Sequence, residues 1–245
     1  MPVSISADVV LLDIEGTTSS IDFVHQTMFP FARQRVASFV RAHRGSETLD
    51  HCIELLANDL GHASVASWLD GDAATNEQTI IDAVTKMIDQ DIKATGLKQM
   101  QGIIWKDGFH SGELVAHLYE DAAPAMKCWK AAGLDLRVYS SGSIAAQKLF
   151  FGHSVAGDLL HLFSAHYDTT TGPKKESESY RKIVADIDCD PNRIVFISDV
   201  PAELDAAKEA GLQTVLSLRP GNAPVADQHA YLAIESFESL SISRE

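Results

Sequence analysis

The sequence has few cysteines, no basic leader and no long apolar run. Its three cysteines, Cys52, Cys128 and Cys189, lie far apart, and none belongs to a C-x-x-C pair. Because one disulfide would leave an odd thiol, we expect a reducing compartment and a cytoplasmic protein. The N-terminal residues lack the basic and apolar regions of a signal peptide, and no apolar run approaches the roughly 20 residues that span a bilayer. We therefore expect no membrane segment.

Positive charge is also scarce. Over 245 residues, 20 Lys and Arg stand against 34 Asp and Glu, which gives a formal net charge of −14. Nucleic acids and anionic membranes attract clustered lysine and arginine, so we expect neither to be the main partner. A small anion needs only local positive charge or a bound metal and stays compatible with this balance. The hydrophobic content of 45% is ordinary for a soluble folded chain.

Short and almost continuous apolar runs predict buried strands of a parallel sheet. They cover residues 9–12, 136–139, 194–198 and 214–218. Helical patterns occupy residues 122–132, 177–187 and 202–210. Gly133 and Gly211 follow two of these helices and are typical C-terminal stops. Alternating strands and helices predict an α/β fold with a doubly wound, mostly parallel sheet.

Residues 21–121 break this alternation, because they contain several helical patterns and no convincing strand. Pro30 suits the first turn of one helix, and a second helix covers residues 49–60. Thr75-x-x-Gln78 matches a capping box ahead of an apolar stripe that runs to Ile92. A block of about 100 residues is too long for a connection, so we predict a helical domain inserted into a core domain. The predicted boundaries are 21–121 for the insert, and 1–20 with 122–245 for the core.

Two carboxylates follow the first predicted strand closely. The stretch reads Asp13-Ile14-Glu15-Gly16-Thr17-Thr18. Ligands of open α/β sheets bind at the carboxyl ends of the strands, and the glycine allows a tight turn there. Acidic residues and a glycine also often do no more than end a strand, so this motif needs support from other strand ends.

That support comes from polar residues farther along the chain. Ser140 and Ser141 follow the second predicted strand, Asp199 follows the third, and Lys174 lies in a loop just before a helix. Three carboxylates suit a hard cation such as Mg²⁺, while hydroxyls and an ammonium suit phosphate oxygens. One of these carboxylates can also act as a nucleophile. A single lysine is usually a surface residue, but the combination points to phosphoryl chemistry.

These motifs resemble the haloacid dehalogenase superfamily of aspartyl-phosphate phosphohydrolases. Asp13-x-Glu15-Gly16-Thr17 matches the first motif of that superfamily, with Glu where Asp is commoner. Ser140 or Ser141 fits the second motif, Lys174 the third and Asp199 the fourth. The resemblance implies that the helical insert is a cap domain.

Within the superfamily, the chain is similar to the enolase-phosphatase family of methionine salvage from about Val9 to about Leu240. The stretches that carry this similarity are residues 12–18, 97–105, 139–143, 147–149, 174–180 and 219–222. The resemblance implies that 2,3-diketo-5-methylthiopentyl 1-phosphate is enolised and then dephosphorylated to the acireductone. It also implies one Mg²⁺ per chain and a small phosphate ester as the partner. We expect a monomer.

The same resemblance implies a role for each site residue. Asp13 is expected to attack phosphorus, and Glu15 to protonate the leaving oxygen and then activate water. The predicted phosphate-binding residues are Ser140, Ser141 and Lys174. The predicted metal ligands are Asp13, Glu15 and Asp199. The sequence does not indicate which residue is the base that removes the carbon-bound proton.

Three alternatives share some of these features. Signalling receiver modules also place acids, a hydroxyl and a lysine around Mg²⁺, but they pair adjacent acids and carry no large helical insert. A haloacid dehalogenase proper needs no metal, so Glu15 and Asp199 count against it. The alternative prediction is a phosphatase of the same superfamily that acts on a different small phosphate ester.

Overall fold

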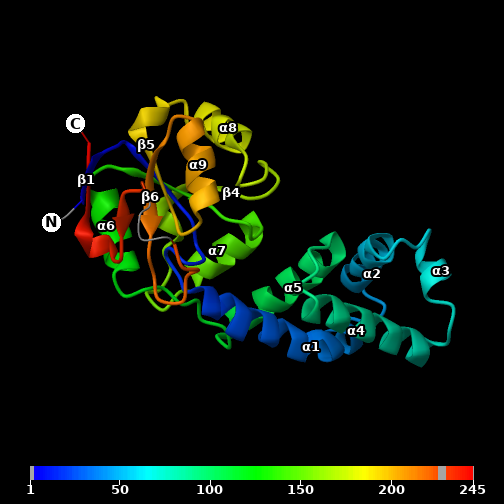
Figure 1. Cartoon of the computed structure of the whole chain (residues 1–245). Coiled ribbons are helices and arrows are strands. Elements are labelled where there is room, and N and C mark those ends of the chain that lie inside the picture. The colour runs from blue at the N-terminus through cyan, green and yellow to red at the C-terminus, as the bar shows by residue number, and fades with distance from the viewer. Residues whose placement is uncertain (1–2, 226–229, 245) are drawn as a thin grey trace. The chain divides into compact units, whose positions relative to one another are not determined.

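A computed structural model describes residues 3–225 and 230–244, and its largest sheet has six strands (Figure 1). All neighbouring strands in this sheet are parallel, in the order β4-β3-β2-β5-β6-β7. The strands are β2 (Val9–Leu12), β3 (Asp135–Tyr139), β4 (Phe163–Tyr167), β5 (Ile194–Ser198), β6 (Gln213–Ser217) and β7 (Ala233–Ile234). A separate parallel pair consists of β1 (Val3–Ser6) and β8 (Leu240–Ser243). The predicted α/β fold is confirmed.

The sequence patterns located the central strands and missed the edge strand β4. Residues 9–12 and 194–198 form strands as predicted, and all of their side chains are buried. β4 reads Phe-Ser-Ala-His-Tyr, and only its last residue is buried. It has a single neighbour, β3, so polar side chains are tolerated along it and the continuous apolar signal is lost.

Helices cover both faces of the sheet. On one face α8 (Ser177–Ile187) and α9 (Pro201–Glu209) pack Tyr180 and Leu204 into a cluster with strand residues such as Phe196. Figure 1 shows α6 (Ala122–Ala131) on the other side. Gly133 and Gly211 follow helices with φ of 84° and 93°, values that glycine adopts at little cost.

The order of the strands reverses around β2. The chain places β3 and β4 on one side of β2, then β5, β6 and β7 on the other. A crevice outside the carboxyl ends of the strands at such a reversal is the usual ligand site of an open α/β sheet. Leu12 of β2 pairs with Ile197 of β5, so the residues that follow these two strands emerge at the same place.

The chain divides into two compact units. The core unit comprises Met1–Val24 and Val115–Glu245, and the helical unit comprises His25–Leu114. These boundaries fall inside the predicted insert of 21–121, because residues on both flanks are attached to the core unit. The Tyr119 amide donates to the Thr18 carbonyl over 3.0 Å, and the Phe23 ring lies 5.9 Å from that of Phe150.

Residues 25–114, all of which the structure describes, form helices and no strand. The segment Phe23–Met28 is a π-helix that leads into α1. The α-helices are α1 (Phe29–Ala42), α2 (Glu47–Asp59), α3 (Val65–Trp68), α4 (Ala73–Asp89) and α5 (Thr95–Ser111). Gly96 allows close packing of α5 on α2, since a Cβ there would lie 2.6 Å from the Leu56 nitrogen.

The predicted start of α4 was wrong. Asp72 caps this helix by accepting a hydrogen bond from the Thr75 amide over 2.8 Å, so the helix begins before the proposed capping box. The helix also ends at Asp89, which leaves Ile92 outside it and 40% exposed. Asp72 can replace Thr75 as the N-terminal cap of α4 because an aspartate is at least as good a cap as a threonine.

In the part of the chain that the structure describes, we find no helix long and apolar enough to traverse a bilayer.

Candidate active site

Asp13 directly follows β2 and is buried, with 4% of its surface exposed. Its backbone amide donates to the Ile197 carbonyl over 3.0 Å, which continues the ladder between β2 and β5 by one residue. The carboxylate Oδ1 accepts a hydrogen bond from the Ile14 amide at 2.8 Å, and Oδ2 accepts one from the Ser198 hydroxyl at 3.2 Å. Both carboxylate oxygens are therefore oriented by the ends of two adjacent strands.

Lys174 is a buried residue that contacts Asp13, and not a surface lysine. Its Nζ lies 2.6 Å from Asp13 Oδ2 and 2.6 Å from Glu203 Oε2. Burial alone lowers the pKa of this ammonium, but the charges of the two carboxylates outweigh burial and raise the pKa above its ordinary value. The Tyr180 hydroxyl holds the Lys174 carbonyl over 2.7 Å, so the loop before α8 is fixed. The site keeps a permanent positive charge.

Glu203 completes this group, and sequence reasoning missed it. It lies in the first turn of α9, 6% exposed, and its Oε2 lies 3.0 Å from the Ser198 hydroxyl, whose one proton is shared between Glu203 and Asp13. Burial raises the pKa of its carboxyl, and the charge of Asp13 raises it further. The available signal was its position, one helical turn beyond Asp199 in the segment that follows β5. A glutamate at a helix start is usually exposed, and only packing against Lys174 distinguishes this one.

Asp199 follows β5 and approaches the loop after β2 closely. A Cβ on Gly16 would lie 2.4 Å from Asp199 Oδ2, and Gly16 has a φ of 69°. Burial and the nearby charge of Asp13 raise the pKa of Asp199 to about 7, although Lys174 opposes the shift. The negative charges of Asp13 and Asp199 thus oppose each other in a buried place, an arrangement that a cation would stabilise.

Asn222 is a second residue near the site that was not predicted as a site residue from the sequence. Its Nδ2 donates to the Gly16 carbonyl at 2.9 Å and to the Ser217 carbonyl at 3.1 Å. Its Oδ1 is buried and finds no hydrogen-bond partner among the described residues. Arg219 donates from Nε to the Thr17 carbonyl over 3.3 Å. The loop after β2 is therefore clamped from β6 and the segment that follows it.

The two predicted serines occupy different environments in the turn that follows β3. Ser140 is 2% exposed, and its hydroxyl accepts a hydrogen bond from the Gly142 amide at 3.3 Å. Ser141 is exposed. Because β3 pairs with β2, this turn leaves the same edge of the sheet as Asp13. Glu15 is half-buried in the tight turn in which the Thr17 and Thr18 amides donate to the Ile14 carbonyl.

The acidic residues fit a magnesium ion better than they fit a metal that needs many protein ligands. Within the described residues there is no group of three or more His, Cys, Asp or Glu side chains that could hold a metal ion. Mg²⁺ commonly takes only one or two protein carboxylates and keeps several waters. Asp13 and Asp199 supply two such carboxylates, and the pKa of Asp199 is raised first by burial and then by the charge of Asp13.

This chain belongs to the haloacid dehalogenase-like hydrolases, because the model of that family matches residues 7–211. Curated relatives make the similarity more specific. Enolase-phosphatase E1 of Drosophila mojavensis is 45% identical over 238 residues, which cover 96% of either chain. Enolase-phosphatase E1 of Citrobacter koseri is 47% identical over 90% of this chain and 91% of the relative. The resemblance inferred from the sequence is thus confirmed.

Solved structures agree with the fold. The UTR4 protein of Saccharomyces cerevisiae is 34% identical, with a TM-score of 0.79 over 95% of this chain and 99% of that chain. CbbY of Rhodobacter sphaeroides, crystallised with xylulose-(1,5)bisphosphate, has a TM-score of 0.58 over 96% of this chain and 97% of that chain. At 19% identity, the similarity to CbbY shows a shared fold.

Proposed function

We propose that this chain is a bifunctional enolase-phosphatase of methionine salvage. It converts 2,3-diketo-5-methylthiopentyl 1-phosphate to the acireductone 1,2-dihydroxy-3-keto-5-methylthiopentene and phosphate. Relatives named enolase-phosphatase E1 at 44–47% identity support this activity, since the matches extend over 90–98% of the chain. The structural observation that carries the phosphatase step is the buried contact between Asp13 and Lys174 at the carboxyl end of β2.

Asp13 acts as the nucleophile. Its side chain is buried away from bulk water. The hydrogen bond from the Ile14 amide fixes the position of its Oδ1. Attack of a carboxylate oxygen on phosphorus forms the aspartyl-phosphate, and the bond from phosphorus to the substrate oxygen breaks with its electron pair. Glu15 protonates that oxygen, then removes a proton from the water that hydrolyses the aspartyl-phosphate. Phosphate leaves and both carboxyl groups return to their starting state.

The phosphate oxygens are held by Ser140, Ser141 and Lys174. Lys174 is positioned between two carboxylates, so its ammonium cannot swing away from the reacting phosphorus without leaving both ion pairs. Hydrogen bonds between charged partners are stronger than those between neutral partners. The Lys174 ammonium can therefore stabilise the negative charge on the transferring phosphoryl group. The hydroxyls of the turn after β3 add neutral donors.

Asp13, Asp199 and Glu15, through its backbone carbonyl or its carboxylate, are the residues that would hold one Mg²⁺. When bound, this ion neutralises negative charge on the phosphate and on the enolate oxygen. Asp199 contributes a carboxylate whose pKa is raised to about 7 by burial and by the charge of Asp13. The helical unit serves as the cap domain. The enzyme acts as a cytoplasmic monomer on a small phosphate ester.

The decisive experiment is an anaerobic incubation of the purified protein with Mg²⁺ and the diketone phosphate. Ultraviolet absorbance follows the enolised products, and a phosphate assay follows hydrolysis in the same sample. Both signals should rise together. A matched incubation with a generic phosphate ester reports the phosphatase step alone. Activity on the generic ester and none on the diketone phosphate would leave a phosphatase with a different small substrate.

A further inference from the structure

A buried glutamine spans the turn that follows β3. Gln147 lies on α7 (Ile144–Gly152) and is 1% exposed. Its side-chain nitrogen donates to the Gly142 carbonyl and to the Tyr167 carbonyl, each at 2.8 Å, with the Ser140 carbonyl farther away at 3.4 Å. The two protons of one amide group thus join the turn to the last residue of β4.

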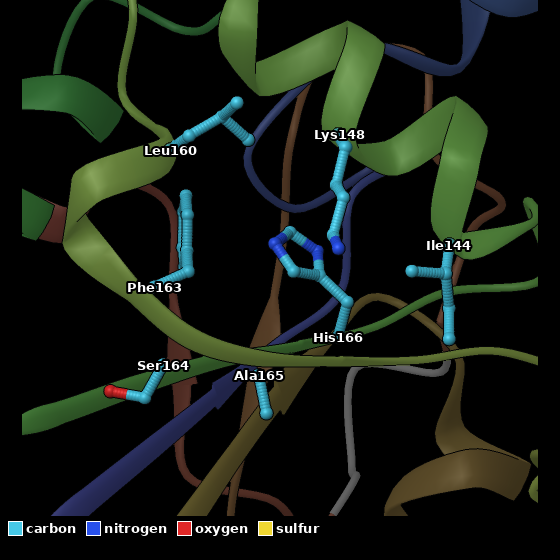
Figure 2. A pocket seen from close by; sticks show the side chains of 7 residues that line it. All are labelled: Ile144, Lys148, Leu160, Phe163, Ser164, Ala165 and His166. Atoms are coloured by element: carbon cyan, nitrogen blue, oxygen red, sulfur yellow. The ribbon is translucent and has the colours of Figure 1, made fainter.

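A histidine sets the orientation of this amide. His166 Nδ1 lies 3.2 Å from Gln147 Oε1, and Oε1 can only accept. Burial, with a smaller contribution from Lys148, lowers the pKa of His166 to about 4, so the ring is neutral at pH 7 and carries its proton on Nδ1. Figure 2 shows the His166 ring and the Lys148 amine directed into the same cavity, whose volume is about 450 Å³.

A hydrogen bond to a backbone carbonyl also fixes the direction of the N–H of the following residue. The carbonyl and the N–H of one peptide group point in opposite directions because the group is planar and trans. When Gln147 holds the Gly142 carbonyl, the amide of Ser143 points away from Gln147. The Ser140 carbonyl makes a longer contact with the same nitrogen, at 3.4 Å, and the amide of Ser141 therefore also points away from Gln147. The Ser141 and Ser143 amides are then directed away from Gln147 just before α7, a helix whose Ile144 amide already donates to an anionic group, Asp168 Oδ2, at 3.0 Å.

We propose that Gln147 is a positioning residue for the phosphate, which holds the carbonyls of the turn after β3 away from the anion while His166 fixes its amide. The inference rests on the proposed function, because it takes this turn as the phosphate-binding turn. Gln147 does not touch the substrate. Its effect is to keep carbonyl oxygens, which would repel phosphate, on the far side of the turn.

The chain offers a matched control. Gln213 also bridges two carbonyls, since its Nε2 lies 2.6 Å from the Ser6 oxygen and 2.6 Å from the Asn192 oxygen. It is the first residue of β6 and therefore lies at the opposite end of the strands from Asp13. Gln147→Glu and Gln213→Glu each replace a donor by a carboxylate of the same shape. Because Gln147 is buried and Gln213 is half-buried, the free energy of unfolding is measured for both variants beside their kinetic constants.

We expect Gln147→Glu to raise KM and the inhibition constant of inorganic phosphate by about tenfold, the effect of losing one or two net hydrogen bonds. The change in kcat should be smaller. Gln213→Glu should leave both constants within about twofold of the wild type. Equal constants in the two variants, in a preparation whose wild type releases phosphate, would overturn the inference. A wild type that hydrolyses no phosphate ester would instead overturn the proposed function.

A second variant covers the case in which Gln147→Glu fails to fold. His166→Phe keeps an aromatic ring beside the cavity and removes the Nδ1 donor, so it should raise the same two constants by about threefold. Nitrogen NMR of the wild type should show the Nδ1-protonated tautomer of His166. In Gln147→Glu the pKa of His166 should rise, because a carboxylate then faces the ring. An Nε2-protonated wild-type ring, or unchanged constants in His166→Phe, would contradict the proposal.

Discussion

An ion pair of the core unit and an ion pair of the helical unit differ sharply in their exposure to solvent. The pair of Lys174 and Asp13 in the core unit has side chains 5% and 6% exposed. In the helical unit, the pair of Arg33 and Asp89 is 48% exposed on both sides. Exposed pairs contribute little to stability, whereas a buried pair costs desolvation and is destabilising to break. The buried pair of Lys174 and Asp13 lies at the carboxyl end of β2, where we propose the active site.

The same contrast holds for a second buried pair in the core unit. Arg219 donates from Nη1 to Asp121 Oδ2 over 2.8 Å, and the side chains are 5% and 9% exposed. The Phe237 amide and the Ser236 hydroxyl donate to the same oxygen. Since Arg219 also holds the Thr17 carbonyl, this pair supports the loop that carries Asp13 and is structural.

Removing the divalent cation is the strongest way to test the charge arrangement of the core unit. Excess chelator should abolish phosphate release, because Asp13 and Asp199 would then repel each other and the phosphate. Added Mg²⁺ should restore the rate. Far-ultraviolet circular dichroism in chelator provides the control for folding. Full activity in chelator would remove the metal from the mechanism.

Asp13→Asn keeps the shape of the side chain and removes its charge. Phosphate release should fall by about 10⁴-fold, because none of the other predicted site residues replaces the attacking oxygen. Enolisation needs the metal and a base but no phosphoenzyme, so the enol intermediate should accumulate. Absorbance and phosphate are measured in one anaerobic sample. A folded variant that released phosphate at the wild-type rate would falsify the covalent mechanism.

Lys174→Met separates the buried pair from the exposed ones. It leaves two buried carboxylates without their cation, so we expect a loss of about 3–5 kcal/mol in the free energy of unfolding. The value of kcat/KM should fall by about 100-fold or more through the lost contact with phosphate. Denaturant titration measures the first effect and initial rates measure the second. Unchanged rates in a folded Lys174→Met protein would remove this lysine from the site.

Lys93→Met tests an exposed ion pair of the helical unit and should have the smallest effect. Its Nζ pairs with Asp91 in the helical unit, and the two side chains are 61% and 60% exposed. Such a pair is screened by solvent, so the thermal midpoint and kcat/KM should stay at wild-type values. A drop comparable to that of Lys174→Met would show that exposure does not separate the two classes of ion pair.

Much of the site could be anticipated because its residues follow strands. Asp13 and Asp199 come directly after buried apolar runs, and parallel strands bring their carboxyl ends to one edge. Glu203 and Asn222 were not predicted as site residues because neither ends a strand. Glu203 is in a helical turn and Asn222 in a loop, where the same residue types are usually exposed.

The sequence by itself determined the α/β class, the parallel central strands and the positions of Asp13, Lys174 and Asp199 in the chain. Apolar runs, helical periods and short motifs are local features, and residues close in sequence encode them. Only the tertiary structure decided that Glu203 shares Lys174 with Asp13, and that Gln147 holds the turn after β3. Those contacts join residues distant in sequence, and burial, which gives them their strength, arises only when the whole core packs.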